Sequence, residues 1–577
     1  MPQFDTVIKG GTVIDGLRTP RFNGDIGIKD GRIASIGSIS SSSGAKVLDA
    51  GGMIVAPGFV DLHTHYDSQI FWDPYCSISG WHGVTSVVIG NCGFGFAPVD
   101  PKDQDRAMLT MARNEAVPLA TMQEGMPWDW ETYPEFLESL DRTPKGINLL
   151  SYLGLNPLLV YVMGIEEKGR AATDEEMARM CQILEEAMDV GCCGFSTQLS
   201  GERSVQRDYD GTPMITDLMP HDDVLKLAAV LKKKGRGFIQ GAGVSHELTE
   251  ALCQASGRPV MSGLGVTTDQ HGQPMDNHKD QMQWLEDANR RGNRVFAQLI
   301  TAEVGFEFTL EDWNLFDSSK PWRDVTLGSV PERIAKMSDP ECRQALRSEF
   351  DEGRGPIAGG GTEDKVGGVN VWGVASMIVE SVEKDELRDC EGLTIAEVAE
   401  RAGKHPIDAM LDLAVEDELK TTFVTPPRER SEGEMEAIKE VCNSDFALPG
   451  VSDGGAHTKF ITLGAYTTEY LTKLVRDEGV MDLEQAHWRL SAYPALAAGI
   501  QDRGWLREGA PADIIVYDYE NLELKPQEKA FDFPADEWRR VRKASGYRWT
   551  LVNGDVTFED GECTGATPGT VLRHGTA

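Results

Sequence analysis

Two hydrophobic patterns alternate over most of the chain. Short apolar runs rich in β-branched residues are typical of buried parallel strands, and they are separated by stretches in which apolar positions recur every three or four residues, as on one face of a helix. This alternation predicts βα units around a parallel sheet. Eight such units predict an α/β fold of the TIM-type (β/α)8 barrel class. The predicted strands end, in chain order, near His65, Gly90, Leu153, Thr197, Gln240, Ser262, Ile300 and Ser452.

One predicted helix, between the third and fourth strands, has clear ends. Thr173 and Glu176 form the capping-box pattern that begins a helix, and Gly191 is placed to end it. Its apolar positions have helical spacing and should face the sheet. They are Met177, Met180, Ile183, Leu184 and Met188.

The two ends of the chain have a strand-and-turn pattern instead. Residues 1–58 and 501–577 contain short strand patterns separated by tight turns such as Asp30-Gly31 and Asn553-Gly554. Two β-rich ends around one core predict a small composite β-sandwich domain. Residues 59–500 would then form the catalytic barrel. A stretch from about 301 to 447 is too long for a simple connection, so we expect a partly helical insertion that covers the barrel mouth.

Composition excludes several kinds of partner. With 577 residues, 40% of them apolar, the chain is long enough for one large barrel and a smaller domain. Its net charge of −36 argues against nucleic acid and anionic membrane surfaces, because no basic excess is available to neutralise phosphates. No segment has the uncharged length needed to span a bilayer, and the ten cysteines contain no CxxC pair. We expect a soluble cytoplasmic enzyme with free thiols that acts on a small molecule and forms a homo-oligomer.

Candidate chemistry lies where predicted strands end. In VDLHTH, His63 and His65 occupy alternate positions of a strand, so their imidazoles face the same side and can converge on one ion. Cys92 follows the second strand and Asp453 follows the eighth. Barrel enzymes place their active sites at the carboxyl ends of the strands, so all four side chains should meet there. Imidazole, thiolate and carboxylate are good zinc ligands, which makes zinc the predicted metal.

Each of these residues also has a structural interpretation. The two histidines can be packed or hydrogen-bonded at a strand end, and Cys92 can be a buried core thiol. Asp453 precedes two glycines and can be a turn residue. His457 either contacts substrate or a neighbouring carboxylate, or makes a structural hydrogen bond.

Several segments together resemble the amidohydrolase superfamily. APGFVDLHTH carries the general resemblance, and GNCGFGFAPVD with VSDGGAH is similar to its D-aminoacylase (N-acyl-D-amino-acid deacylase) branch. DRG at 502–504, ADIIV at 512–516 and GATPG at 565–569 also match. The resemblance implies the barrel with its composite β-sandwich. It also implies that Cys92 is the thiolate ligand of the metal, and that Asp453 accepts the proton of the zinc-activated water and passes it to the leaving nitrogen.

The chain departs from that family at two strands. Members usually carry one metal-binding histidine at the end of strand five and one at the end of strand six, where this chain has Gln240 and Ser262. Strand four offers no lysine of the kind that is carbamylated to bridge two metals. We therefore predict one zinc per chain rather than two. Three histidines of the following loops are candidate replacement ligands, each with an ordinary loop role as the alternative: His246, His271 and His278.

These observations favour a zinc-dependent hydrolase of a non-peptide C–N bond, with an N-acyl amino acid as substrate. Opening of a cyclic amide, imide or lactone by the same activated water is an alternative. A catalytically silent homologue with an assembly role is another, because the strand-five and strand-six histidines are missing. Arg203, Arg207 and Lys365 are candidates to meet a substrate carboxylate, although each can equally be a solvated surface residue.

Overall fold

The structure is a computed structural model of the 577-residue chain. It describes residues 2–575 except residues 203, 205, 267–273, 275, 276, 304, 313–315, 318, 353–360, 363, 364, 367–372, 428, 461 and 462.

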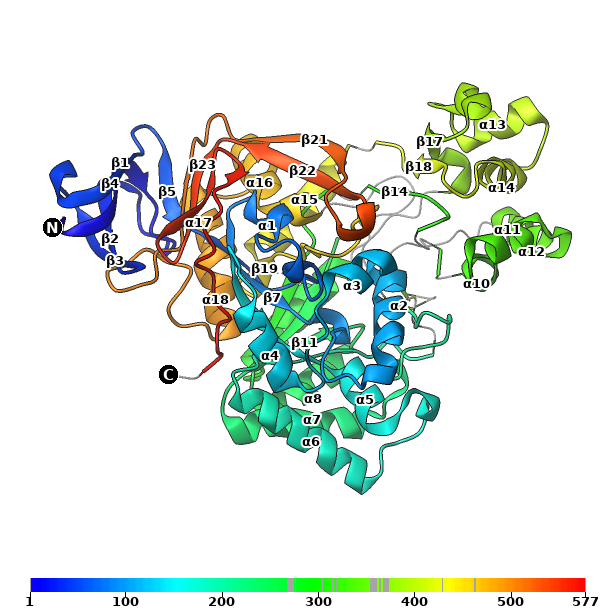
Figure 1. The fold of residues 1–577 in the computed structure, drawn as a ribbon, viewed down its shortest axis with the longest axis horizontal. Coiled ribbons are helices and arrows are strands. Elements are labelled where there is room, and N and C mark those ends of the chain that lie inside the picture. Colours follow the sequence, from blue (N-terminus) through cyan, green and yellow to red (C-terminus); the bar gives the residue numbers. More distant parts are fainter. Residues whose placement is uncertain are drawn as a thin grey trace.

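Two parallel sheets form the centre of the molecule (Figure 1). A three-stranded sheet has the order β6–β7–β8, and a six-stranded sheet has the order β9–β10–β11–β12–β13–β19. All neighbouring strands in both sheets run parallel. The strands are β6 (Phe59–Asp61), β7 (Val84–Ile89), β8 (Asn148–Ser151), β9 (Leu153–Gly154), β10 (Gly194–Gln198), β11 (Phe238–Ala242), β12 (Val260–Leu264), β13 (Val295–Leu299) and β19 (Ala447–Pro449).

The two sheets meet at both of their ends. Only Tyr152 separates β8 from β9, so the first sheet continues directly into the second. At the other side, Thr64, just after β6, makes a parallel bridge with Gly454, just after β19. The His65 amide donates to the Gly454 carbonyl at 2.7 Å. Segments nearly four hundred residues apart in sequence therefore lie side by side.

Side chains from both sheets share one core. Buried residues of the strands pack with three alanines of α18 (Tyr493–Ala498) in a single cluster. Burial of each large apolar side chain in such a cluster stabilises the fold by about 1.5–3 kcal/mol. The members on or beside the strands are Val60, Leu62, Val88, Leu150, Tyr152, Cys193, Phe238, Met261, Phe296 and Leu448.

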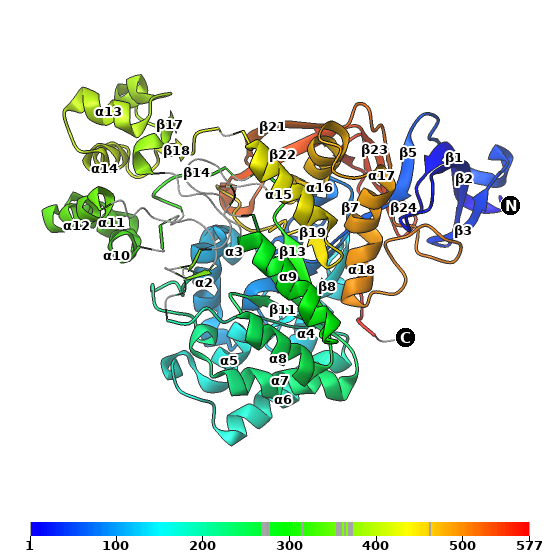
Figure 2. The ribbon, with the colours of Figure 1, turned by 180° about the vertical axis from the view of Figure 1, so that it is seen from behind.

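Helices cover the outside of the strands. Helices α2 to α5 lie on the side seen in Figure 1, α9, α15 and α18 lie on the side seen in Figure 2, and α6 to α8 lie below the strands in both views. They include α2 (Gln104–Glu115), α3 (Leu119–Gly125), α4 (Tyr133–Arg142), α5 (Leu155–Met163), α6 (Asp174–Asp189), α7 (His221–Lys234), α8 (His246–Ser256), α9 (Asn277–Arg290) and α15 (Glu432–Asn443).

Both ends of the chain contribute to a single nine-stranded sheet. Its order is β25–β24–β23–β20–β5–β1–β2–β3, with β4 on β1. The ends join where β20 (Ile514–Tyr517) pairs antiparallel with β5 (Ile54–Pro57). The other strands of this sheet are β1 (Phe4–Val13), β2 (Phe22–Lys29), β3 (Arg32–Gly37), β4 (Gly44–Asp49), β23 (Tyr547–Val552), β24 (Asp555–Glu559) and β25 (Glu562–Cys563). A separate hairpin of β21 (Glu523–Ala530) and β22 (Arg539–Ser545) reaches toward the parallel strands.

The stretch between β13 and β19 is partly helical, as its length suggests. Its helices α10 to α14 stand apart from the central sheets at one side of the molecule (Figure 1), whereas α15 packs beside β19. A small antiparallel sheet, β14–β18–β17, accompanies them. The elements are β14 (Glu307–Phe308), α10 (Lys320–Thr326), α11 (Val330–Ser338), α12 (Pro340–Asp351), β17 (Ile378–Ser381), α13 (Ile395–Ala402), α14 (Pro406–Glu416) and β18 (Thr422–Val424).

The predicted helix after the third strand is confirmed as α6. Thr173 and Glu176 form both hydrogen bonds of the capping box, and the predicted apolar face is buried. Two strand ends were predicted wrongly, because β6 ends at Asp61 rather than near His65, and β19 ends at Pro449 rather than near Ser452. Beyond these ends the two segments pair only through the Thr64 bridge, and their side chains turn into the space between them. Among the described residues, the helices are too short or too polar to cross a membrane.

Asp513 ties the nine-stranded sheet to the parallel strands. This buried carboxylate pairs with the buried Arg503 and accepts hydrogen bonds from Asn553 N at 2.7 Å and Asn148 Nδ2 at 3.2 Å. Its carbonyl oxygen accepts from Gly58 N at 3.0 Å. The side chain thus connects the C-terminal strands with the start of β8, and the backbone carbonyl adds the start of β6.

We expect Asp513→Ala to destabilise the protein by about 3–5 kcal/mol, because Arg503 would remain buried without its partner. Denaturant unfolding followed by circular dichroism measures this. Asp502→Ala is the matched control, since Asp502 is 52% exposed and only 3.8 Å from the same arginine. Its effect should stay within about 0.5 kcal/mol. Equal stability of the two variants would contradict this role for Asp513.

Candidate metal centre

Three side chains with metal-binding atoms converge beyond the ends of β6 and β7. Donor atoms of His63, His65 and Cys92 lie within 4.8 Å of one another, and all three residues are buried. Asp453 Oδ1 lies 3.3 Å from His63 Nε2 and 3.6 Å from His65 Nε2. The structure therefore brings together the four residues that the sequence singled out.

His63 is held from three sides. Its Nδ1 faces Gln298 Oε1 on β13 at 3.1 Å, which leaves Nε2 directed at Cys92 Sγ, 3.3 Å away. Its amide donates to Asp61 Oδ1 at 3.1 Å, and Ser452 Oγ donates to its carbonyl at 3.1 Å. An amide oxygen on one ring nitrogen favours the tautomer in which the other nitrogen presents a lone pair, as a metal requires.

Cys92 sits in a turn that needs left-handed backbone. Its φ is 55°, between Gly90 at 78° and Gly93 at 79°. A Cβ on Gly90 would lie 2.8 Å from Tyr152 O, so that position suits only glycine. The Cys92 amide donates to Gln240 Oε1 on β11 at 2.7 Å, and the Gly93 amide donates to Ser196 Oγ on β10 at 2.9 Å. The turn is therefore fixed by two strands other than its own.

Close backbone contact sets the position of His65 relative to Asp453. Gly455 has a φ of 88°, and a Cβ there would lie 2.8 Å from the carbonyl group of His65. Asp453 itself has a φ of 45°. Because glycine tolerates this conformation and this approach, the GG after Asp453 lets the loop pack directly against the His65 backbone.

The charges of the clustered side chains depend strongly on one another. Burial disfavours charge on His63, but the Cys92 thiolate and the Asp453 carboxylate raise its pKa to about 9. Burial likewise opposes the ionised form of Cys92, yet His63 and His65 lower its pKa. Burial would raise the pKa of Asp453, but His457, His65 and His63 hold it well below its usual range. The positive charge that stabilises these two buried anions comes from the neighbouring imidazoles, and a divalent cation bound between them would supply the same charge.

The second oxygen of Asp453 faces another buried group. Asp453 Oδ2 lies 3.7 Å from His457 Nε2, and His457 Nε2 lies 3.5 Å from Glu115 Oε2 at the end of α2. His457 therefore contacts a carboxylate of the candidate site, which was one of the two interpretations that its sequence position allowed.

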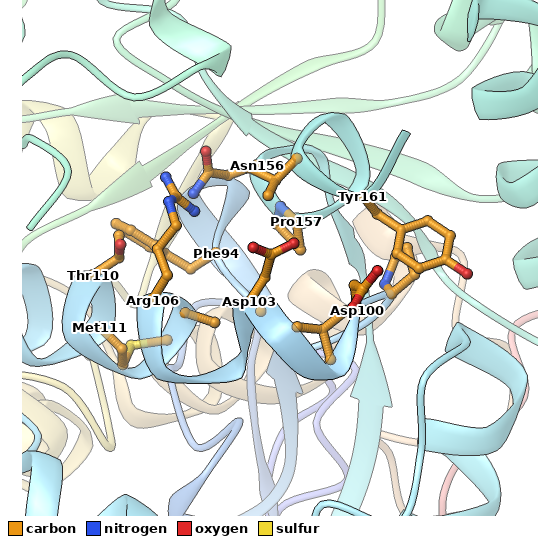
Figure 3. A pocket seen from close by; sticks show the side chains of 14 residues that line it. Phe94, Asp100, Asp103, Arg106, Thr110, Met111, Asn156, Pro157 and Tyr161 are labelled. Carbon is orange, nitrogen blue, oxygen red and sulfur yellow. The ribbon is translucent and has the colours of Figure 1, made fainter. Parts of the chain in front are cut away.

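A pocket lies next to the centre, between α2 and α5 (Figure 3). It is narrow, with a cavity volume of about 30 Å³. Phe94 lines it and also contacts the His65 ring, with 6.0 Å between ring centroids. Apolar Met111 and Pro157 form part of the wall, whereas Arg106 and Asn156 add polar groups.

The two replacement ligands within the described part of the chain, His246 and His278, do not join the centre. His246 begins α8 and stacks on Trp284 at 3.9 Å, and buried His278 on α9 lies 3.4 Å from Glu440. Both were expected in loops and lie on helices instead. His271 lies outside the described residues. Gln240 hydrogen-bonds the Cys92 amide through its Oε1, and its Nε2 lies 3.9 Å from the Cys92 sulfur.

Of the three residues predicted to meet a substrate carboxylate, only Arg207 has a described side chain. Arg207 is buried rather than on the surface, with 6% exposure. Arg203 and the side chain of Lys365 lie outside the described part of the chain.

Two residues of the site were missed. Gln298 was detectable as a single polar residue near the end of the apolar strand VFAQL. Glu115 gave no signal, because a glutamate at a helix end is usually solvated.

The chain is similar to proteins of one family over most of its length. The model of the amidohydrolase family matches residues 46–558. An N-acyl-D-aspartate deacylase of Alcaligenes xylosoxydans xylosoxydans is 36% identical over 100% of this chain and 96% of its own. A D-aminoacylase of the same organism is 25% identical over 99% of this chain and 97% of its own. A crystal structure of N-acyl-D-glutamate deacylase from Bordetella bronchiseptica, complexed with zinc and a phosphonate inhibitor, superposes with a TM-score of 0.67 at 22% identity and covers 99% of this chain and 100% of its own. The fold is therefore shared with that structure.

We expect Cys92 to resist iodoacetamide in metal-loaded protein and to react once a chelator has removed the metal. Coordination occupies the sulfur lone pair, whereas in metal-free protein the neighbouring histidines favour the reactive thiolate. Mass-spectrometric mapping of the labelled cysteines measures both states. Cys253, whose pKa burial raises to about 12, and Cys181 are internal controls. Equal labelling of Cys92 in both states would exclude it as a ligand.

Proposed function

The chain belongs to the amidohydrolase family, and on that premise we propose that it is a zinc-dependent hydrolase of N-acyl amino acids, cleaving a non-peptide amide bond. The single observation that carries this proposal is the convergence of His63, His65 and Cys92 with Asp453 Oδ1 beside both imidazoles. Packing alone gives no reason for two imidazoles, a thiol and a carboxylate to meet in one buried place.

We infer that the parallel strands close into a (β/α)8 barrel. The common core of both sheets, the direct continuation of β8 into β9 and the Thr64–Gly454 bridge support closure. Residues 1–58 and 501–577 would then form the small β-sandwich domain and residues 59–500 the catalytic barrel. The division is supported by the nine-stranded sheet that both chain ends share.

The donor set fits one zinc ion. Two imidazoles, one thiolate and one carboxylate are the ligand types that zinc prefers, and both imidazoles present Nε2 to Asp453 Oδ1. Gln240, at the strand-five position, is already engaged with the Cys92 amide. A second ion has no comparable group of donors in the described part of the chain. One zinc per chain is therefore expected, held by His63, His65 and Cys92, with Asp453 as a weaker fourth ligand whose place a water molecule can take.

Zinc at such a site lowers the pKa of a bound water and polarises a carbonyl group. The protein supplies the proton transfers. Asp453 Oδ1 points at the same space as the two imidazoles and is ionised, so it can accept a proton from an attacking water. The same carboxyl group then donates that proton to the leaving nitrogen. Gln298 keeps His63 in the required tautomer.

The relatives define the substrate class that we propose. One of them is an N-acyl-D-aspartate deacylase at 36% identity, and others are a D-aminoacylase and an N-acyl-D-glutamate deacylase. We therefore infer a preference for N-acyl amino acids of D configuration.

Hydrolysis of a cyclic amide, imide or lactone needs the same activated water and is the second candidate reaction. A catalytically silent scaffold is less consistent with the site, because its buried charges oppose folding unless a cation balances them.

Zinc-loaded protein should hydrolyse an N-acyl-D-amino acid among a matched panel of N-acyl-D- and N-acyl-L-amino acids, with N-acetyl-D-aspartate included. Release of the free amino acid and elemental analysis of the same sample measure turnover and metal together. About one zinc per chain is expected. A zinc content near zero, or activity that survives complete removal of metal, would contradict the proposal.

Two variants separate ligand from proton acceptor in the same assay. His63→Ala should lose both zinc and activity, because the ion loses a donor. Asp453→Asn should keep most of its zinc and lose turnover by roughly 10²–10⁴-fold, the usual contribution of a positioned acid–base group. Full activity of Asp453→Asn would exclude its proposed role.

A further inference from the structure

Glu115 is a buried carboxylate in an unfavourable place. It is the last residue of α2 and only 1% exposed. Neither of its carboxylate oxygens accepts a hydrogen bond from the described residues. A negative charge at the C-terminal end of a helix meets the negative end of the helix dipole, and burial removes its hydration. The local structure therefore does not account for a glutamate at this position.

His457 is the proton-donating group that faces this carboxylate. Glu115 Oε2 lies 3.5 Å from His457 Nε2, and the same nitrogen lies 3.7 Å from Asp453 Oδ2. Both of these groups are hydrogen-bond acceptors, so they favour the tautomer of His457 in which Nε2 is the donor. The imidazole is thus placed between Glu115 and the far oxygen of the residue that we assign as proton acceptor.

The backbone fixes this arrangement as well. The His457 amide donates to the Glu115 carbonyl, and Thr458 Oγ1 donates to the Ala116 carbonyl at 2.8 Å. His457 has a φ of 54°, and Phe460 packs against its ring with centroids 4.7 Å apart. The loop after Asp453 is therefore attached to the end of α2 at the point where Glu115 projects.

We propose that Glu115 is a positioning residue, whose charge holds His457 against Asp453 Oδ2 and so keeps Asp453 Oδ1 directed at the space beside His63 and His65. Asp453 needs this support, because one carboxyl group must keep a single orientation while it accepts a proton and then gives it up. A glutamate supplies an attraction to the Nε2 proton that a neutral side chain of the same shape does not. The inference rests on the proposed hydrolase function and adds two residues to it.

Glu115→Gln tests the charge without changing the shape. In zinc-saturated protein it should lower kcat by roughly 10–100-fold, the usual range for a residue that orients a group of a metal site, and leave KM and zinc content unchanged. A merely structural glutamate would not produce a loss in kcat alone. Glu124→Gln is the matched control, because Glu124 is exposed on the neighbouring helix α3 and should behave as wild type.

His457→Asn removes the imidazole that forms the other half of the contact with Glu115. Asparagine tolerates the positive φ of this position, so the loop should keep its conformation. If Glu115 acts through His457, the double variant should lose no more activity than the more impaired single variant, because the two losses are then not independent. Full additivity of the two losses would overturn the proposal.

Cobalt provides a readout that does not depend on turnover. The visible spectrum of Co²⁺-loaded protein reports the geometry of the bound donors, and Glu115→Gln should change it in the same way as His457→Asn. Wild-type kcat and an unchanged cobalt spectrum in Glu115→Gln would refute the positioning role alone. Absence of metal uptake and turnover in wild-type protein would instead refute the proposed function, and the positioning role with it.

Discussion

The close approach of residues 63–65 to residues 453–455 is the constraint on which the site depends. It is fixed by the hydrogen bond from the His65 amide to the Gly454 carbonyl, at 2.7 Å, and by the Thr64–Gly454 bridge. Only a glycine allows the approach at Gly455, where a Cβ would lie 2.8 Å from the His65 carbonyl group. The contact places the eighth strand's aspartate beside the first strand's histidines, and without it Asp453 would not face either ring.

Electrostatics explains why these groups are held so firmly. A buried thiolate and a buried carboxylate are unfavourable unless cationic or hydrogen-bonding groups surround them. The fold supplies these groups from several strands: Gln240 and Ser196 hold the Cys92 turn, and Gln298 holds His63. Because each support comes from a different strand, the arrangement of the four groups depends on how β10, β11 and β13 pack around them.

Features that depend on local patterns could be predicted from the sequence. Alternating apolar runs predicted the parallel strands, and Thr173 with Glu176 predicted the start of α6. The resemblance to amidohydrolases supplied the roles of Cys92 and Asp453, which spacing alone did not. Features that depend on tertiary contact could not be predicted. Glu115 is ordinary in its helix and becomes notable only because the loop at His457 packs on the helix end. His246 and His278 have the chemistry of ligands, but α8 and α9 direct them elsewhere.

Anomalous diffraction at the zinc edge, from crystals of zinc-loaded protein, tests the proposed metal centre most directly. We expect one peak per chain, within bonding distance of about 2.0–2.3 Å of a nitrogen of His63, a nitrogen of His65, the Cys92 sulfur and an Asp453 oxygen. A peak that lies elsewhere, two peaks of equal height, or a peak beyond reach of the Cys92 sulfur would contradict this centre.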